Sequence, residues 1–298
     1  MFTIGKIYHV VHVVSNLDAA DKWYDSIFSP NRYYHGYMDE AKRDASLLAI
    51  GDFVMEPVAV AKVPGAEDSA LGRFFARFGP RLHSVAWFVD SVPNAFDKFR
   101  QHNVRMYGAD GIPLKAPKPG RAFFTHPKDT YGTLEFAPHG GLRPDSDPRL
   151  KPGWSTAFWR DQHPLGMQRA SHMTTLVRDL DKATAFYRDV VGGTLLHEEA
   201  IAGRKSSVYF ALGNETVMEL AQPLSSSSAE GRELERCGEG LYSVTIKVND
   251  IRKAESFLRS KRMRIEAQDG GSFVLNREDS LGAVLGFTER QLPNDHRQ

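Results

Sequence analysis

One pair of polar residues occurs twice in this chain in the same frame. His9 is followed 47 positions later by Glu56, and His172 is followed 47 positions later by Glu219. Each histidine opens an apolar run, and each glutamate closes a Val-Met-Glu triplet. Self-similarity at a fixed spacing indicates repeated structural units. Because imidazole and carboxylate groups are common metal ligands, the repeat also predicts a symmetric arrangement around a metal ion.

The local pattern divides the chain into units. Residues 7–14 (IYHVVHVV) are rich in β-branched residues, which favours a strand. Asn16 is a suitable N-cap for a helix from Leu17 to Phe28. Three short apolar pieces then follow, separated by charged or glycine-containing turns, and predict three further strands at 33–38, 45–50 and 53–60.

This strand-helix-strand-strand-strand order recurs three more times. The later units open at 82–92, 171–180 and 241–251, and units one and three match best, as do units two and four. Pro, Gly and charged residues are dense at 138–167, which suits a linker. We therefore expect one domain at 1–140, a linker at 141–167 and a second domain at 168–298. The connectors at 61–81 and 222–240 are predicted to be flexible loops or lids.

The composition indicates a globular protein that acts on small molecules. Of the 298 residues, 41% are hydrophobic and 25% are charged, and the net charge of +1 provides no field to recruit nucleic acid or a membrane. Cys237 is the only cysteine, which excludes an internal disulfide. The N-terminus lacks signal-peptide features and no apolar run reaches the ~18 residues of a membrane span. We expect a cytoplasmic protein with a small-molecule substrate, and a homodimer remains open.

These units resemble the vicinal oxygen chelate superfamily, which includes glyoxalase I, methylmalonyl-CoA epimerase, extradiol dioxygenases and antibiotic-resistance proteins. The resemblance spans roughly residues 5–290. It rests on the histidine at the head of the first strand, the glutamate on the last, the paired aromatics Trp23-Tyr24 and Phe186-Tyr187, and the YGTLEF segment that ends in Glu135-Phe136. It implies an α+β fold in which two units pair into an open, eight-stranded half-barrel, or cup, around one divalent metal ion.

Carried over residue by residue, the four metal positions of that superfamily fall in the first half on His9, Glu56, His83 and Glu135. In the second half they fall on His172, Glu219, Tyr242 and either Leu285 or Gly286. Neither Leu nor Gly can bind a metal through its side chain, so the resemblance implies one complete site and one degraded site.

The alternation of side chains along a strand limits which histidines can point into the cup. His9 and His12 are three residues apart and should point to opposite faces of a strand. The match with His172 selects His9 for the cup, and His12 is expected to be a surface or loop residue. On the next unit's first strand, alternation places His83 on the face of Val85, Trp87 and Val89.

Members of the superfamily pair their units in two ways, and the sequence leaves both open. If unit one pairs with unit two, the complete set is His9, Glu56, His83 and Glu135. If unit two pairs with unit three, the complete set is His83, Glu135, His172 and Glu219. His83 and Glu135 belong to the complete site under both arrangements.

Two imidazoles and two carboxylates suit Ni²⁺, Co²⁺, Zn²⁺, Mn²⁺ or Fe²⁺. Such an ion stabilises an enediolate, and Glu135 or Glu56 would then move a proton as the catalytic base. The sequence therefore favours a metal-dependent isomerase, epimerase or lyase. Two alternatives remain: an extradiol-type dioxygenase with a His9/His83/Glu135 iron site, and a non-catalytic protein that binds a drug or metabolite.

Overall fold

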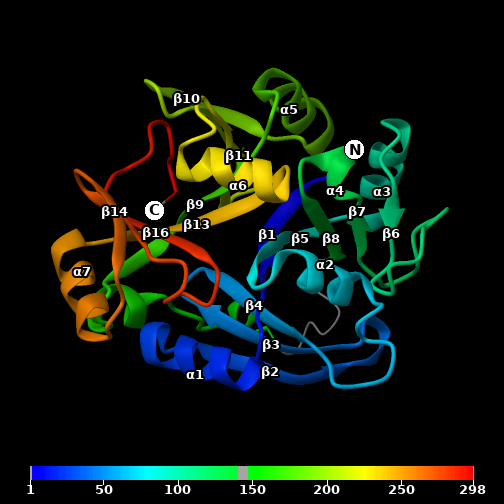
Figure 1. Ribbon diagram of the computed structural model, residues 1–298. Helices are drawn as coiled ribbons and strands as arrows, with labels where there is room; N and C mark the ends of the chain where they lie inside the picture. The colour runs from blue at the N-terminus through cyan, green and yellow to red at the C-terminus, as the bar shows by residue number, and fades with distance from the viewer. Residues whose placement is uncertain (1, 140–146, 298) are drawn as a thin grey trace.

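The computed structural model describes residues 2–139 and 147–297, which form two eight-stranded sheets with helices (Figure 1). The first sheet has the order β2 (Asn31–Met38), β3 (Arg43–Ile50), β4 (Phe53–Val60), β1 (Ile4–Val13), β5 (Arg81–Val89), β8 (Thr133–Pro138), β7 (Phe123–Thr125) and β6 (Met106–Tyr107). The second has the order β10 (Thr194–Ile201), β11 (Lys205–Leu212), β12 (Thr216–Pro223), β9 (Met167–Leu176), β13 (Gly240–Val248), β16 (Val284–Thr288), β15 (Ser272–Leu275) and β14 (Ile265–Asp269). Every described strand therefore finds its partner within its own half of the chain.

The helices follow the repeat as well. They are α1 (Leu17–Phe28), α2 (Ala70–Phe78), α3 (Val92–Gln101), α4 (Pro127–Thr130), α5 (Leu180–Phe186), α6 (Ala229–Cys237) and α7 (Ile251–Ser260), with short turns of 3-10 or π-helix at η1 (Asp39–Ala41), η2 (Pro148–Leu150), η3 (Phe158–Gln162) and η4 (Tyr187–Val191). The helix α1 has the predicted bounds, and the side chain of Asn16 accepts a hydrogen bond from the Ala19 amide at 2.8 Å as the predicted N-cap. None of the described helices is long and apolar enough to cross a membrane.

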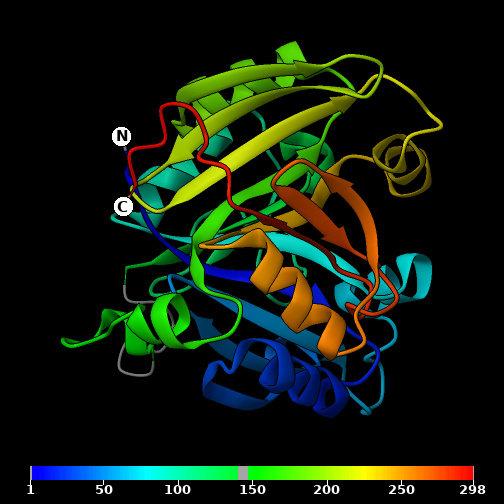
Figure 2. The same ribbon diagram turned by 90° about the vertical axis from the view of Figure 1, so that its left-hand side faces the viewer.

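The sheet order decides how the units pair. Unit one joins unit two through β1 and β5, which run antiparallel, and unit three joins unit four through β9 and β13 in the same way. Figure 2 shows the two sheets side by side, with β9–β12 in green and yellow above the blue strands of the first sheet. The pairing of unit two with unit three, which the sequence left open, does not occur in these sheets.

The two connectors predicted to be flexible loops or lids each contain a helix, so the prediction of a plain loop was wrong. Ser69 caps α2 and Ser228 caps α6, and each side chain accepts a hydrogen bond from the amide three residues ahead. The four-serine run at 225–228 therefore ends in a helix N-cap rather than continuing as a flexible loop.

The two halves share one hydrophobic core. A single cluster of buried apolar side chains takes in both sheets and the helices α1, α3, α5 and α7. Arg81 forms a buried ion pair with Glu233 across the halves at 3.2 Å. His12 is fully buried rather than on the surface: Nε2 donates to the Leu281 carbonyl at 3.0 Å, so Nδ1 accepts from the Tyr24 hydroxyl at 2.9 Å. The expectation for His12 was wrong because this residue faces the core between the halves.

A second repeated feature links the segment that follows each half to the central strand of that half. An Asp-x-Arg triplet follows each half, as Asp147–Arg149 and Asp295–Arg297. Arg149 pairs with Asp147 at 2.7 Å and donates to the carbonyls of Ile7, Tyr8 and Asp52. Arg297 repeats this pattern with Asp295 and the carbonyls of residues 170, 171 and 215, each 163 positions after its counterpart in the first half.

We predict that Arg149→Met lowers the free energy of unfolding by about 3–5 kcal/mol, because it removes the guanidinium that balances the charge of the buried Asp147 carboxylate. Urea denaturation measures the change. Arg160→Met, which removes an exposed arginine paired with Asp161, is the matched control and should leave the unfolding midpoint unchanged. Adding Asp147→Asn to Arg149→Met should restore part of the loss. Equal stability of the Arg149 and Arg160 variants would contradict the structural role of the Arg149 pair.

Candidate functional site

The predicted site histidines lie at irregularities in the central strands. On β1, Ile7 faces Trp87 and His9 faces Ala86, so the register shifts at Tyr8, which is an extra residue of β1 at this point. A β-bulge of this kind places two successive side chains on one face and commonly occurs beside active sites. The rings of Tyr8 and His9 accordingly lie 4.3 Å apart, and both belong to the cup side of the sheet.

A second bulge determines the direction of His83. Val11 faces Ser84 and His12 faces Leu82, so His83 is the extra residue on β5. It lines the first cup beside Ser84, and its Nδ1 lies 2.8 Å from the Ser84 hydroxyl. Strict alternation had placed His83 on the face of Val85 and Trp87, which pack in the core instead. That prediction was wrong because the bulge shifts the alternation by one residue.

Three of the four predicted ligands come together on the floor of the first cup. His9 Nε2 lies 3.1 Å from Glu135 Oε2 and 3.2 Å from Glu56 Oε2, and all three side chains are almost fully buried. The other oxygen of Glu56 accepts a hydrogen bond from Arg43 Nη2 at 3.0 Å. Arg43 was not among the predicted site residues. It begins β3 and brings a guanidinium group onto a carboxylate that was expected to bind a metal.

The charges of this cluster favour a protonated His9. Burial acts to lower the pKa of His9, but the negative charges of Glu56 and Glu135 outweigh it and raise the pKa above the ordinary value. With His9 neutral, two carboxylates face the single positive charge of Arg43, so a proton on the imidazole balances the cluster. Burial beside Arg43 and Arg81 lowers the pKa of His83 to about 4, so its ring is neutral at physiological pH.

A pocket of about 720 Å³ opens in front of this cluster. Arg43, His83 and Ser84 line it at the cup floor, with Thr133 and Phe124 from the adjoining strands. The helix α2 covers another side, where the ring of Phe74 packs edge-on against His83 at 4.5 Å. Of the charged groups at the floor, Arg43 lines the pocket, and it contacts Glu56 of the buried cluster.

The arrangement does not fit the predicted four-ligand metal centre. Across residues 2–139 and 147–297, no group of three or more His, Cys, Asp or Glu side chains is arranged so that it could hold a metal ion. Two contacts explain this result. Arg43 holds one oxygen of Glu56, and His83 is turned toward Ser84 and forms no ion pair with a described carboxylate.

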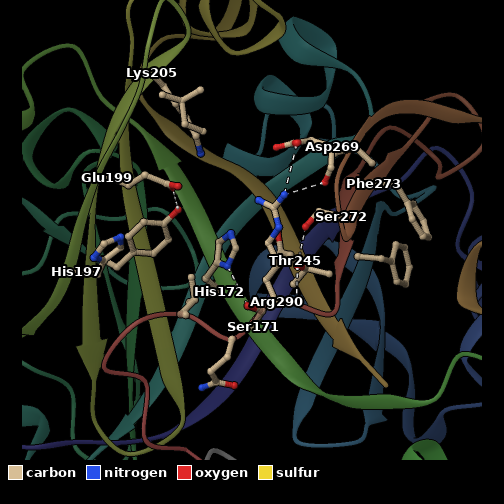
Figure 3. Close-up of a pocket in the computed structure, with 18 of the residues that line it drawn as sticks. Ser171, His172, His197, Glu199, Lys205, Thr245, Asp269, Ser272, Phe273 and Arg290 are labelled. Carbon is tan, nitrogen blue, oxygen red and sulfur yellow. Dashed lines mark hydrogen bonds and ion pairs between the residues drawn. The ribbon is translucent and has the colours of Figure 1, made fainter. Parts of the chain in front are cut away.

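The second cup contains a related but different cluster, and Figure 3 labels two of its members, His172 and Lys205. His172 Nε2 lies 3.6 Å from Glu219 Oε2, and the Lys205 ammonium forms an ion pair with the other oxygen of Glu219. Hydroxyl groups of Thr174, Ser207 and Tyr209 also donate to Glu219, at 2.6, 2.7 and 3.0 Å. The carboxylate of Glu219 is therefore saturated with hydrogen-bond donors.

This saturation changes the electrostatics of the second cup. Although burial alone would raise it, the pKa of Glu219 is held well below its usual range by Lys205 and the other donors. Because Lys205 already balances Glu219, no excess negative charge favours a proton on His172. Burial therefore lowers the pKa of His172 to about 4.

The register of the second sheet decides between the two candidates for the missing ligand. On β13 and β16, Thr245 faces Gly286, just as Ala86 faces Glu135 on β5 and β8. Gly286 is therefore the counterpart of Glu135. A Cβ atom added to Gly286 would lie 2.8 Å from the Thr245 hydroxyl, so a larger side chain requires Thr245 to move.

Comparison with known proteins identifies the fold. Residues 169–271 match the model of the Glyoxalase/Bleomycin resistance protein/Dioxygenase superfamily. A solved structure of a triple mutant of 4-hydroxymandelate synthase from Streptomyces coelicolor aligns over 98% of this chain and 95% of its own, with a TM-score of 0.67 and 13% identity. The predicted resemblance and the α+β cup architecture are both confirmed, and at this low identity the solved structure supports the fold alone.

Curated relatives match a smaller part of the chain. Mouse mitochondrial methylmalonyl-CoA epimerase is 38% identical over 98 residues, which are 32% of this chain and 54% of the mouse protein. The uncharacterized protein YqjC of Bacillus subtilis (strain 168) is 27% identical over 99 residues, which are 33% of this chain and 71% of that protein. The chain thus spans about half the length of the mouse relative. The named relatives include enzymes.

Arg43 and Lys205 contact the site glutamates but were not predicted from the sequence motifs. A signal for them is present, because the third strand of units one and three follows a basic pair, Lys42-Arg43 and Arg204-Lys205. Basic pairs next to turns are common on protein surfaces, where they are solvated. The long β3–β4 and β11–β12 hairpins bring these two residues back over the cup, and that contact is visible only in the folded chain.

We predict that the pKa of His9 lies above the ordinary histidine value and that the pKa of His172 lies below it. In metal-free buffer near pH 6.5, His9 should carry a proton whereas His172 should be neutral. Histidine-selective NMR with nitrogen-15 labelling reports both states, and His9→Gln and His172→Gln assign the signals. Glu135→Gln removes one of the two negative charges and should lower the pKa of His9. A neutral His9 at pH 6.5 in the unaltered protein would contradict this electrostatic description.

Proposed function

We propose that the first cup is the active site of an isomerase or epimerase, which transfers a proton at a carbon next to a carbonyl group of an anionic, oxygenated small molecule. The observation that carries this proposal is the position of His9 between Glu56 and Glu135, behind Arg43 at the floor of the pocket. The cluster combines two bases, a proton-bearing imidazole and a cation within hydrogen-bonding distance of one another.

The chemistry follows from these groups. The Arg43 guanidinium binds the substrate's oxygen atoms and stabilises the negative charge that develops on the carbonyl oxygen. A carboxylate, Glu135 or Glu56, takes the proton from the carbon, and the electron pair of the C–H bond moves toward the carbonyl oxygen. Return of the proton to the other face of the carbon, or to a neighbouring atom, completes an epimerisation or isomerisation. The positive charge of protonated His9 reduces the repulsion between the two carboxylates, and its contacts with both hold them in place.

The two glutamates of this cluster are shielded from water. Glu56 and Glu135 are each almost completely buried. His83, neutral at the pocket wall, can donate or accept a hydrogen bond with a bound ligand without adding charge. These residues thus provide both binding and proton transfer without any step that depends on groups outside the chain.

The curated relatives suggest the first substrate to assay. The mouse protein is named a methylmalonyl-CoA epimerase. Methylmalonyl-CoA carries a carboxylate and a thioester carbonyl on either side of one acidic carbon, which is the arrangement that Arg43 and the glutamates would recognise. The dioxygenase alternative has less support, because His83 does not join His9 and Glu135 into the three-ligand set that such an iron site requires.

We expect the protein to exchange the α-proton of methylmalonyl-CoA or a related acyl thioester with solvent. In D₂O and without oxygen, proton NMR should show loss of the α-proton signal at a rate that rises with enzyme concentration. Protein inactivated by heat is the control. Oxygen uptake with catechols, together with no deuterium incorporation into any tested acid or thioester, would instead support a dioxygenase.

We further predict that Glu135→Gln lowers kcat by about 10²–10⁴, the usual contribution of a positioned general base. The pKa of the glutamine amide lies outside the range needed for proton transfer, whereas its size is close to that of glutamate. Glu235→Gln, on the exposed face of α6, removes the same charge far from the cup and should have the kcat of the unaltered protein. Circular dichroism confirms that both variants are folded. Unchanged kcat in Glu135→Gln would remove this residue from the proposed mechanism.

A further inference from the structure

Both cups have a basic side chain in the same place. Arg43 is the first residue of β3 and pairs with Val60, four residues after Glu56. Lys205 is the first residue of β11 and pairs with Pro223, four residues after Glu219. The two cations are therefore at equivalent positions of the repeat, and each forms an ion pair with the glutamate of its own unit.

Each cation lies where its charge can replace that of a bound ion. Arg43 Nη2 is 3.0 Å from Glu56 Oε1, and its side chain is largely buried. A divalent ion held by the other oxygen of Glu56 would lie only a few ångströms from the guanidinium, and two cations at that distance in a buried site repel strongly. The same argument applies to Lys205, which shares the Glu219 carboxylate with three hydroxyl donors.

Both cations line their cups. Arg43 Nε is buried and has no hydrogen-bond partner among the described residues, although the side chain lines the first pocket. Lys205 lines both pockets of the second cup, which have volumes of about 310 and 450 Å³. Figure 3 shows Lys205 pointing into the cup from the wall above His172. A guanidinium or ammonium group in such a position is suited to a carboxylate or enolate oxygen.

We propose that the side chains of Arg43 and Lys205 take the place of the metal ion. Each cup then binds an oxyanion ligand through its own cationic side chain, without a metal. For the first cup, this inference rests on the proposed function, because it assigns the stabilisation of the developing oxyanion to Arg43. This metal-free binding differs from the metal dependence that the superfamily resemblance implies. For the second cup it defines a site for a small carboxylate, although the counterpart of Glu135 is absent there.

Metal titration tests the proposal without using turnover. Purified protein is freed of metal with a chelator, and Co²⁺ is added while visible absorption and calorimetry report binding. The unaltered protein should bind Co²⁺ at neither cup. Arg43→Met removes the charge but keeps an unbranched side chain of similar length, and it should bind one Co²⁺ per chain with an affinity about tenfold or more above that of the unaltered protein. Glu56→Gln added to Arg43→Met should abolish this gain.

Arg32→Met is the matched control, since Arg32 pairs with Asp25 on the outside of the cup and its removal changes the net charge equally. It should bind no more Co²⁺ than the unaltered protein. If Arg43→Met does not fold, Arg43→Gln serves in its place with the same expectation. Stoichiometric Co²⁺ binding by the unaltered protein that is lost in Glu56→Gln would overturn the proposal.

Ligand binding gives a second, independent readout. Oxalate, which has two neighbouring carboxylate groups, is titrated into the protein in the presence of a chelator. The unaltered protein should bind it, and Arg43→Met should lose affinity about tenfold or more, whereas Arg32→Met should not. Oxalate affinity that appears only after Co²⁺ is added would overturn the proposal. Because neither titration involves a reaction, a wrong choice of substrate in the proposed function leaves both results interpretable.

Discussion

The hydrogen bonds from Arg149 and Arg297 to the central strands are the contacts on which the two sites depend. Each arginine binds two successive carbonyl groups at a β-bulge, in β1 for Arg149 and in β9 for Arg297. A bulge leaves backbone groups without partners in the sheet, and in a buried position such groups must be satisfied by other donors. The arginines therefore stabilise the irregular backbone that points His9 and His172 into their cups.

The two cups share this backbone and differ in charge. In the first, Glu56 and Glu135 face one arginine, and the excess negative charge keeps a proton on His9. In the second, Gly286 replaces the second glutamate, Lys205 balances Glu219, and His172 stays neutral. The two cups therefore share a backbone scaffold and differ in the charged and hydrogen-bonding groups around their glutamates.

The repeated pattern allowed much of the architecture to be predicted. The matched spacing of His9–Glu56 and His172–Glu219 related units one and three, and Asn16 marked the start of α1 correctly, because capping and periodicity are local properties of the chain. The resemblance to the superfamily assigned His9, Glu56 and Glu135 to one site, and the folded chain brings these three side chains together. Strand alternation failed at His83, where an extra residue in β5 shifts it. A bulge arises from pairing between strands and has no signal within one strand.

The amino-acid sequence by itself determined the units, their order and which polar residues lie on their central strands, since these follow from short-range periodicity. Tertiary structure decided the rest. Only the folded sheets show that unit one pairs with unit two, that Gly286 is the counterpart of Glu135, and that Arg43 and Lys205 return across long hairpins to the glutamates. The physical reason is that each of these facts is a distance between residues far apart along the chain, and charge in a buried site depends on distance rather than on sequence position.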